Sequence, residues 1–103
     1  MGEIISNSEV EISVVSPVYM AEGIINLLVK EISEACNLIT NRYEIILVED
    51  GSKDESWSDI KNVCQKNFFV KGLKLSRNFG QHVAIKAGLK KAKGKWIIVM
   101  DCD

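Results

Sequence analysis

The sequence predicts an α/β fold in which a parallel β-sheet is flanked by helices. Short, apolar, β-branched runs alternate along the chain with longer segments of helical periodicity, a pattern typical of strands joined by helical crossovers. The apolar runs contain few polar residues, as expected for strands that are buried on both faces of a sheet. The chain has 103 residues, which is near the common size of one domain.

The first half of the chain is expected to form two strands separated by one helix. Residues 11–18 (EISVVSPV) are β-branched and nearly all apolar, and Pro17 is expected to end this strand. Residues 22–39 are expected to form the helix, because apolar residues recur there at helical spacing. These residues are Ile24, Leu28, Ile32, Ala35 and Ile39. Residues 43–50 (YEIILVED) form a second buried strand that ends in acids.

A second helix and a third strand are predicted next. Ser52 and Glu55 match a capping box, in which a serine at the helix start precedes a glutamate by three residues. The side chains expected on one side of this helix are Trp57, Ile60, Val63 and Cys64. Residues 68–75 (FFVKGLKL) follow as a third, weaker strand.

The last part of the chain is predicted to add a helix and a fourth strand. Residues 80–92 form the helix, with Ile85, Leu89 and Ala92 facing inward, and Gly94 is expected to be its C-terminal cap. Residues 95–101 (KWIIVMD) form the strand. The order strand, helix, strand, helix, strand, helix, strand implies a parallel sheet with right-handed connections.

The composition and the termini limit the class of protein. Hydrophobic residues make up 47% of the chain and charged residues 26%, as in ordinary globular proteins. No apolar run approaches the roughly 18 residues of a membrane span, and residues 1–11 do not resemble a signal peptide. Cys36, Cys64 and Cys102 are widely spaced, which favours reduced thiols and a cytoplasmic location.

Charge is distributed unevenly along the chain. Residues 1–59 contain twelve acids and three bases, whereas residues 60–103 contain two acids and ten bases. The basic part fits either a solvated helix face or a surface for phosphates or anionic lipid headgroups. Nucleic acid is not expected as a partner, because no aromatic residues are interleaved with the lysines.

Polar side chains follow the predicted strands where parallel sheets bind ligands, beyond the carboxyl ends of the strands. Asp101 and Asp103 offer hard oxygen ligands for Mg²⁺ or Mn²⁺, although Asp-x-Asp alone also fits two solvated acids. Asp50 ends the second predicted strand, and it is expected either to be free to accept hydrogen bonds from a base or a ribose, or to belong to a plain turn. Arg77 is suited to a phosphate or a base edge, or lies on the surface. Tyr19 either stacks on a base or packs against the first helix.

Together these segments resemble a known enzyme family. The segments "ISVVSPVY", "YEIILVEDGSKDES" and "LKLSRNFGQHVAIKAGLKKAKGKWIIVMDCD" resemble the family 2 glycosyltransferases of the GT-A fold, and most of all the branch of dolichyl- and polyprenyl-phosphate sugar transferases. The resemblance covers about residues 11–103, with residues 1–10 as an N-terminal tail. It implies a Rossmann-like sheet, the N-terminal half of a GT-A domain, that binds a nucleoside-diphosphate sugar and a divalent ion.

The resemblance also implies roles for single residues. Pro17, Val18 and Tyr19 would line the nucleotide pocket. Asp50 would hydrogen-bond the base, Ser52 would shape the turn, and Arg77 would approach the base or the diphosphate. Asp101 would contact the ribose or the waters of the ion, and Asp103 would ligate the Mg²⁺ or Mn²⁺. Met20 and Ala21 depart from the Asn and acids common after the tyrosine, and Glu49 replaces an aspartate, so the finer nucleotide contacts stay open.

The expected reaction is metal-dependent, inverting transfer of a sugar from a UDP- or GDP-linked donor to an acceptor, for which the branch suggests polyprenyl phosphate. The family continues past Asp-x-Asp into an acceptor half with the catalytic base. The chain is therefore expected to be a truncated, inactive donor half that self-associates through uncovered apolar surface. Its full-length parent is expected to be associated with the cytoplasmic face of a membrane.

Three other classes remain as alternatives. A dinucleotide-binding domain needs G-x-G-x-x-G after the first strand, where this chain has residues 17–22 (PVYMAE). A receiver-like signalling module needs acids after the first and third strands, but the third strand ends in residues 76–78 (SRN). A folded half-site that binds nothing tightly is compatible with the family resemblance.

Overall fold

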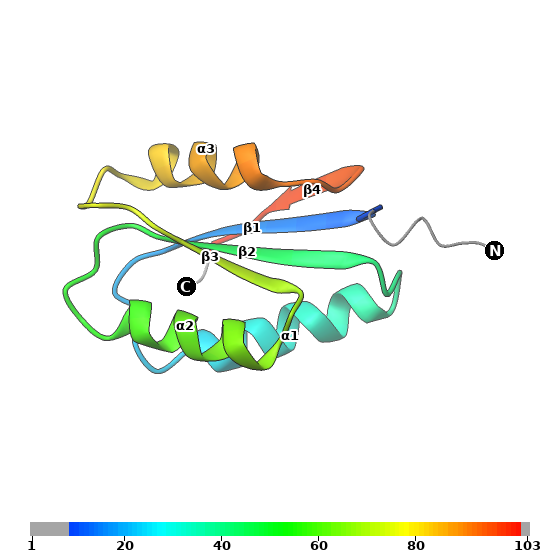
Figure 1. Cartoon of the computed structure of the whole chain (residues 1–103), viewed down its shortest axis with the longest axis horizontal. Coiled ribbons are helices and arrows are strands. Elements are labelled where there is room, and N and C mark those ends of the chain that lie inside the picture. Colours follow the sequence, from blue (N-terminus) through cyan, green and yellow to red (C-terminus); the bar gives the residue numbers. More distant parts are fainter. Residues whose placement is uncertain (1–8, 102–103) are drawn as a thin grey trace.

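The computed structural model describes residues 9–101, which form a four-stranded parallel sheet with helices on both faces (Figure 1). The strand order is β3-β2-β1-β4. The strands are β1 (Ile12–Val18), β2 (Tyr43–Glu49), β3 (Val70–Lys74) and β4 (Trp96–Val99). The helices are α1 (Ile25–Asn37), α2 (Ser56–Lys66) and α3 (Gln81–Lys91). The predicted order of elements and the parallel sheet are confirmed.

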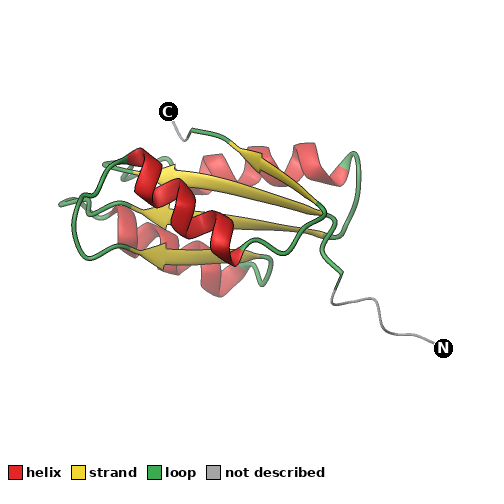
Figure 2. Cartoon of the chain, turned by 90° about the horizontal axis from the view of Figure 1, so that it is seen from above, coloured by secondary structure: helices red, strands yellow, loops and turns green. Residues whose placement is uncertain are grey.

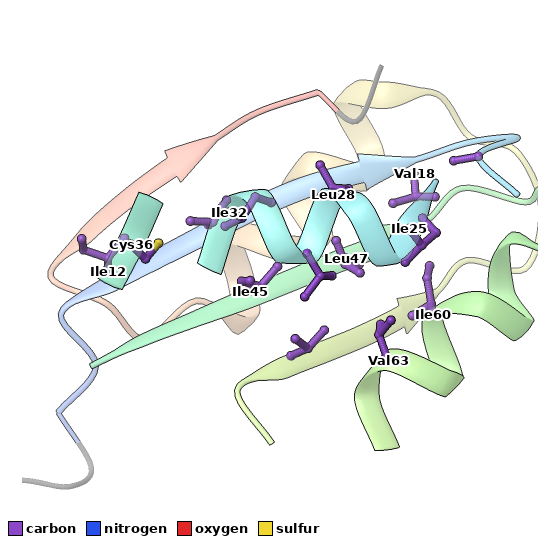
Figure 3. Close-up of a cluster of buried hydrophobic side chains, with 14 residues drawn as sticks. Ile12, Val18, Ile25, Leu28, Ile32, Cys36, Ile45, Leu47, Ile60 and Val63 are labelled. Atoms are coloured by element: carbon purple, nitrogen blue, oxygen red, sulfur yellow. The ribbon is translucent and has the colours of Figure 1, made fainter. Parts of the chain in front are cut away.

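Two apolar clusters hold the helices against the sheet. Helices α1 and α2 cover one face, and α3 alone covers the other (Figures 1 and 2). The larger cluster lies under α1 and α2 and includes Ile25, Ile45, Leu47 and Ile60, all fully buried (Figure 3). The smaller cluster lies under α3, where Ala84 packs with Val15, Ile46 and Val48. Strands β1 and β2 are therefore buried on both faces, which explains their continuous apolar sequences.

The first strand does not end at Pro17, contrary to the expectation from the sequence. β1 continues through Val18, and Pro17 is paired with Val48 of β2. The register of β4 on β1 stops at Val15 and Val99. Pro17 therefore lies where β1 has no neighbour on its β4 side, so its missing N–H leaves no ladder hydrogen bond unmade.

Several predicted helix details were wrong because the apolar pattern allowed more than one helix phase. Ile24, Ile39 and Leu89 are exposed. Ala92 does pack against the smaller cluster as expected, but the buried positions of α3 are Ala84 and Gly88. In α1 the buried residues are Ile25, Leu28, Val29, Ile32 and Cys36. Small residues face the sheet in α3 because the helix lies close to it: a Cβ on Gly88 would meet Val15 Cγ1 at 2.4 Å.

The predicted helix caps were also wrong. The second helix begins at Ser56, and Glu55 at its N-cap makes no capping hydrogen bond with its side chain. Asp54 serves this end instead, because its Oδ1 accepts hydrogen bonds from Ser56 N at 3.0 Å and Ser56 Oγ at 2.7 Å. Helix α3 ends at Lys91, and its C-cap residue is Ala92, which has an extended conformation, so Gly94 is not the cap.

Gly94 instead allows the start of β4 to approach β1 closely. A Cβ at this position would lie 2.7 Å from both N and Oγ of Ser13. The Gly94 N–H donates to Ser13 Oγ at 2.8 Å, and Ser13 Oγ–H donates to Glu44 Oε2 at 2.6 Å. The close contact therefore belongs to a polar network at the amino end of the sheet.

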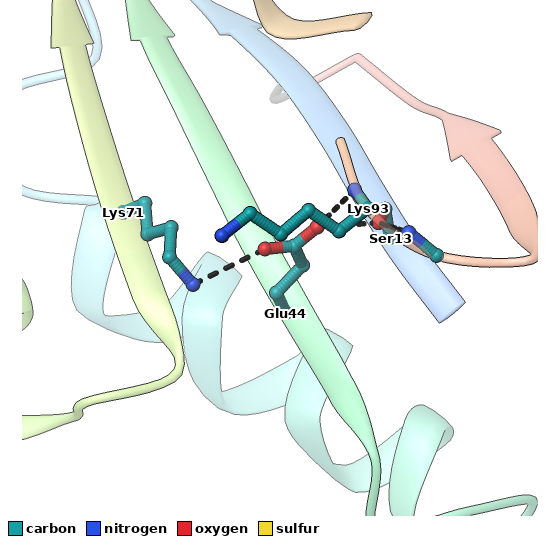
Figure 4. A network of polar contacts seen from close by, with 5 residues as sticks. Ser13, Glu44, Lys71 and Lys93 are labelled. Atoms are coloured by element: carbon teal, nitrogen blue, oxygen red, sulfur yellow. Dashed lines mark hydrogen bonds and ion pairs between the residues drawn. The ribbon is translucent and has the colours of Figure 1, made fainter. Parts of the chain in front are cut away.

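Glu44 is the centre of that network (Figure 4). Its carboxylate is only 1% exposed, accepts a hydrogen bond from Lys93 N at 2.8 Å and pairs with Lys71 Nζ at 3.1 Å. Burial raises the pKa of this carboxyl, but the hydrogen bonds from Ser13, Lys93 and Lys71 outweigh burial and hold the pKa below its ordinary value. One carboxylate thus ties β1, β2, β3 and the start of β4 together.

Strand β4 carries a large apolar surface that the described residues leave uncovered. Its exposed side chains, with the residue that follows, are Trp96, Ile97, Ile98, Val99 and Met100. Ile98 and Met100 line a 290 Å³ apolar groove beside α1, together with Leu28 and Ile39. None of the helices within residues 9–101 is long and apolar enough to cross a membrane.

Candidate functional site

The four strands point their carboxyl ends to one edge of the sheet, where the loops 19–24, 50–55, 75–80 and 100–101 lie (Figure 2). All strands are parallel, so every predicted site residue that the structure describes is at or near this edge. The predicted metal ligand Asp103 lies outside the described residues. Ligands of open parallel sheets bind at this kind of edge.

Asp50, the first residue after β2, is buried and holds the loop that leads into α3. Its Oδ1 accepts a hydrogen bond from Phe79 N at 2.9 Å, and its Oδ2 accepts one from Gly80 N at 3.1 Å. Asn78 Nδ2 adds hydrogen bonds to the carbonyl and the carboxylate of Asp50. The carboxylate is therefore already engaged by the protein, whereas the sequence suggested that it was free. A carboxylate has about four acceptor positions, so this arrangement leaves little capacity for a ligand.

Glu49 and Gly51 shape the turn on either side of Asp50. Glu49 is fully buried, and its carboxylate accepts hydrogen bonds from Gly51 N at 3.1 Å and Ser52 N at 2.6 Å. Gly51 has φ +77°, and a Cβ there would lie 2.2 Å from Asn78 N. The turn after β2 therefore depends on a glycine both for its backbone conformation and for the close approach of the loop after β3.

The loop after β1 is fixed by side chains of the loop and helix that follow β2. Met20 N donates to Ser52 Oγ, and Ala21 N donates to Ser56 Oγ, both at 2.7 Å. The next two amides continue the series, Glu22 N to Asp54 Oδ2 at 3.2 Å and Gly23 N to Asp59 Oδ2 at 2.9 Å. Four successive backbone donors are thus satisfied by one segment, which lets Met20 adopt φ +54°. Ser52 Oγ thus contacts the loop after β1 through Met20 N and does not cap α2, which begins at Ser56.

The N-terminus of α3 lies between Asp50 and Asp101. Asp50 binds the amides just before the helix, and Gln81, its first residue, donates from Nε2 to Asp101 Oδ1 at 2.8 Å. The first N–H groups of a helix have no helical acceptors, and within the described residues no side chain caps those of α3. The positive end of the helix dipole therefore points to the edge where both acids lie.

The side chains of the remaining predicted site residues form no hydrogen bond with Asp50 or Asp101 within the described residues. Arg77 is exposed, and its guanidinium stacks on the Phe79 ring with Cζ 4.5 Å from the centroid. Tyr19 is exposed, as a base-stacking residue would need to be. Pro17 and Val18 are buried at the carboxyl end of β1, so they lie beneath the edge and are not exposed on it. No hydrogen bond joins Arg77 or Tyr19 to either acid within residues 9–101.

Sequence reasoning missed Gln81 and the acceptor series from Ser56 and Asp59. Each of these contacts links residues 20 to 36 positions apart. Polar residues near a predicted helix start were a signal, but the sequence did not indicate their partners.

Few side chains at this edge could bind a metal ion. Within residues 9–101 no three His, Cys, Asp or Glu side chains are grouped so that they could hold an ion. Asp101 is exposed and offers a hard carboxylate oxygen, since only its Oδ1 accepts a hydrogen bond from Gln81. This donor fits Mg²⁺ or Mn²⁺ when phosphate and water supply the other ligands.

The parallel sheet and its edge define an α/β domain in which the uncapped N-terminus of α3 lies next to two acids, Asp50 and Asp101. Residues 13–103 match the family "Glycosyl transferase family 2". The chain belongs to this glycosyltransferase family.

Curated relatives agree with the family. Over 100 residues the chain is 38% identical to an undecaprenyl-phosphate 4-deoxy-4-formamido-L-arabinose transferase of Aeromonas hydrophila subsp. hydrophila, a match that covers 95% of this chain and 31% of the relative. A transferase of the same name from Yersinia enterocolitica is 39% identical over 94 residues, covering 90% of this chain and 29% of the relative. The chain therefore spans about three tenths of the length of these relatives.

Solved structures agree with the fold. The mannosyltransferase PcManGT from Pyrobaculum calidifontis in complex with GDP-Man and Mn²⁺ has a TM-score of 0.77 at 18% identity, covering 92% of this chain and 28% of that one. S. aureus TarS 1-349 in complex with UDP-GlcNAc has a TM-score of 0.75 at 23% identity, covering 90% and 26%. The expected Rossmann-like, GT-A type of sheet is confirmed.

Proposed function

We propose that the edge between β2 and β4 binds the nucleoside-diphosphate part of a sugar donor, and that the protein transfers that sugar to an acceptor. One observation carries the proposal: Asp50 accepts hydrogen bonds from the amides just before α3, Asp101 accepts one from its first residue, and no described side chain caps the N-terminus between these contacts. A diphosphate is the kind of anion that such a helix end favours. Family membership and the sugar-nucleotide complexes named above support the same type of ligand.

The residues would divide the donor among them. Tyr19 is exposed and would stack on the base, and Pro17 and Val18, which precede it in β1, would line the same pocket. Asp50 would meet the base through its remaining acceptor capacity while it fixes the 78–80 loop. Ser52 holds Met20 in place, and Arg77 would turn from Phe79 to the diphosphate or the base edge. Asp101 would contact the ribose or the waters of the ion.

A divalent ion, Mg²⁺ or Mn²⁺, would be held by Asp103 and Asp101 together with diphosphate oxygens. Such an ion neutralises the charge that develops on the leaving diphosphate. The role of this chain is then to position the diphosphate against the α3 N-terminus and to aim Asp101 at it. Hydrogen-bond donors that are already in place cost no reorganisation when charge develops.

We propose a polyprenyl phosphate as the acceptor, because the relatives are named as undecaprenyl-phosphate transferases. In inverting transfer, an acceptor oxygen would attack the anomeric carbon as the bond to the nucleotide diphosphate breaks on the opposite side. No described residue at this edge is positioned as the base, so residues 9–101 alone are proposed to bind the donor without turning it over.

We also propose a cytoplasmic location for the protein, which fits the free thiols of Cys36 and Cys64.

Isothermal titration of the chain with UDP and GDP, each with and without Mn²⁺, tests the proposal. Binding that requires Mn²⁺ and weakens about tenfold or more in Asp101→Asn and Asp103→Asn is expected, since a hydrogen bond or ligand bond to a charged group is lost. Glu34→Gln, an exposed carboxylate on α1, is the control and should bind like the parent. A chain that is folded by circular dichroism but binds neither nucleotide would contradict the proposal.

We also propose that the chain self-associates through β4 and its groove. An unpaired edge strand with exposed apolar side chains favours pairing with another strand. Ile98→Lys should shift light-scattering masses toward the monomer, because Ile98 lines the groove. Leu38→Lys is the matched control, since Leu38 is 88% exposed but does not line the groove. Monomers of the parent chain at high concentration would contradict this proposal.

A further inference from the structure

The outer side of α3 carries a basic face that the donor site does not use. Val83, Lys86, Ala87, Lys90 and Lys91 follow the i, i+3, i+4, i+7, i+8 spacing of one helix face. The opposite side of the helix packs on the sheet through Ala84 and Gly88. Among the described residues α3 is the only helix on its side of the sheet, so no other helix covers this face (Figure 1).

A shallow groove of 810 Å³ runs between this face and β3. Its apolar lining comes from Leu73, Leu75, Val83, Ala87 and Leu89, and its charged lining from Lys74, Lys86, Lys90 and Lys91. Val83 and Leu89 remain 43% and 39% exposed. The groove therefore combines accessible apolar side chains with lysines, and none of its lining residues is acidic.

The three α3 lysines of this groove are electrostatically uncompensated. Residues 60–100 contain no Asp or Glu, and within residues 9–101 none of Lys86, Lys90 and Lys91 forms an ion pair. Lys86 and Lys90 are one helical turn apart, so they repel each other. Lys90 and Lys91 do lie at the favourable, C-terminal end of the helix dipole, but the dipole accounts for only part of the cluster. A concentration of unpaired positive charge is suited to an anionic partner.

We propose that the α3–β3 face binds an anionic membrane surface. Lysine ammonium groups would meet lipid phosphates, while their aliphatic stems and Val83 and Leu89 contact the interfacial region. The apolar side chains of the groove favour a membrane over a soluble polyanion, because a polyanion would gain no binding energy from contact with Val83 or Leu89. The proposal does not depend on donor binding, because no residue of this face belongs to the nucleotide edge.

Vesicle sedimentation of the folded chain tests the proposal. The probes are phosphatidylcholine vesicles that contain about one third phosphatidylglycerol, and vesicles of pure phosphatidylcholine. Binding is expected only to the anionic vesicles and should fall at high salt. In Lys86→Gln/Lys90→Gln/Lys91→Gln the partition coefficient should drop by about a hundredfold, since each lysine near the surface contributes roughly fivefold.

Two further variants separate the possible causes. Lys30→Gln/Lys61→Gln/Lys66→Gln removes the same charge from exposed positions on α1 and α2, and it should retain most of the binding. Val83→Ser/Leu89→Ser should weaken vesicle binding but leave binding to inorganic polyphosphate unchanged. Equal losses in the two lysine variants, or binding to polyphosphate without binding to anionic vesicles, would overturn the proposal, whatever the result of nucleotide titration.

Discussion

Gln81 and Asp101 are joined by a hydrogen bond of 2.8 Å from Nε2 to Oδ1, which ties the first residue of α3 to the acid that follows β4. Both side chains are exposed. The bond fixes Oδ1 of Asp101, and within the described residues Oδ2 accepts no hydrogen bond. Fixing Oδ1 also restricts the orientation of the whole carboxylate. Gln81 is therefore a candidate positioning residue for the acid that we assign to the ribose or the ion.

Replacing Gln81 tests this relationship. Gln81→Ala should weaken Mn²⁺-dependent nucleotide binding by about two- to tenfold, the range for loss of one partly solvated hydrogen bond. Stability should hardly change, because neither side chain is buried. Titration calorimetry and thermal unfolding measure the two effects, and Gln65→Ala, an exposed glutamine on α2, is the control. Unchanged nucleotide binding in Gln81→Ala would remove the positioning role.

The turn after β2 gives a prediction about stability. Gly51→Ala should lower the free energy of unfolding by about 3 kcal/mol or more, because it adds a backbone clash to the cost of positive φ. Gly23→Ala is the matched control: Gly23 has φ +90° but nothing within 4 Å of an added Cβ. It should cost only about 1 kcal/mol. Equal losses in urea unfolding would show that the approach of the 77–78 backbone is unimportant.

Two buried serines on β1 should respond differently to the same change. Ser13 and Ser16 are both fully buried. Ser13 joins Glu44 to Gly94, whereas Ser16 Oγ has no hydrogen-bond partner within the described residues. Ser13→Ala should cost about 1–3 kcal/mol, and Ser16→Ala should be neutral or stabilising. Chemical denaturation compares them, and a larger loss for Ser16→Ala would contradict the assigned network.

Glu44 should make stability depend on pH in the acid range. Its folded-state pKa is lowered, so the folded protein binds its proton less readily than the unfolded chain. The stabilisation is therefore present above the unfolded pKa of about 4.3 and is lost as pH falls through the folded value. Denaturant unfolding at a series of pH values should show this slope, with a shallower slope in Glu44→Gln. Glu34→Gln, an exposed carboxylate, should retain the parent slope.

Local pattern was enough for the order of elements and for the edge of the sheet that we propose as the donor site. Buried parallel strands such as 43–50 are continuous apolar runs, and the acids that follow them are placed at one edge by the parallel order alone. Which side of each helix faces the sheet was harder to predict, because α3 packs on the sheet through small residues and not through its large apolar ones. Leu89 looked like an inward residue but is exposed, while Gly88 is buried.

The sequence by itself determined the α/β class, the family resemblance and the polar residues at the carboxyl ends of the strands. Tertiary structure decided what those residues contact. Asp50 is occupied by amides near residue 79, Ser52 binds Met20, and Gln81 binds Asp101. These partners are 20 to 32 positions apart, and they meet only because the strand order β3-β2-β1-β4 brings their loops together. Hydrogen bonds require geometry within a few tenths of an ångström, and residue spacing along a chain does not specify such geometry between separate elements.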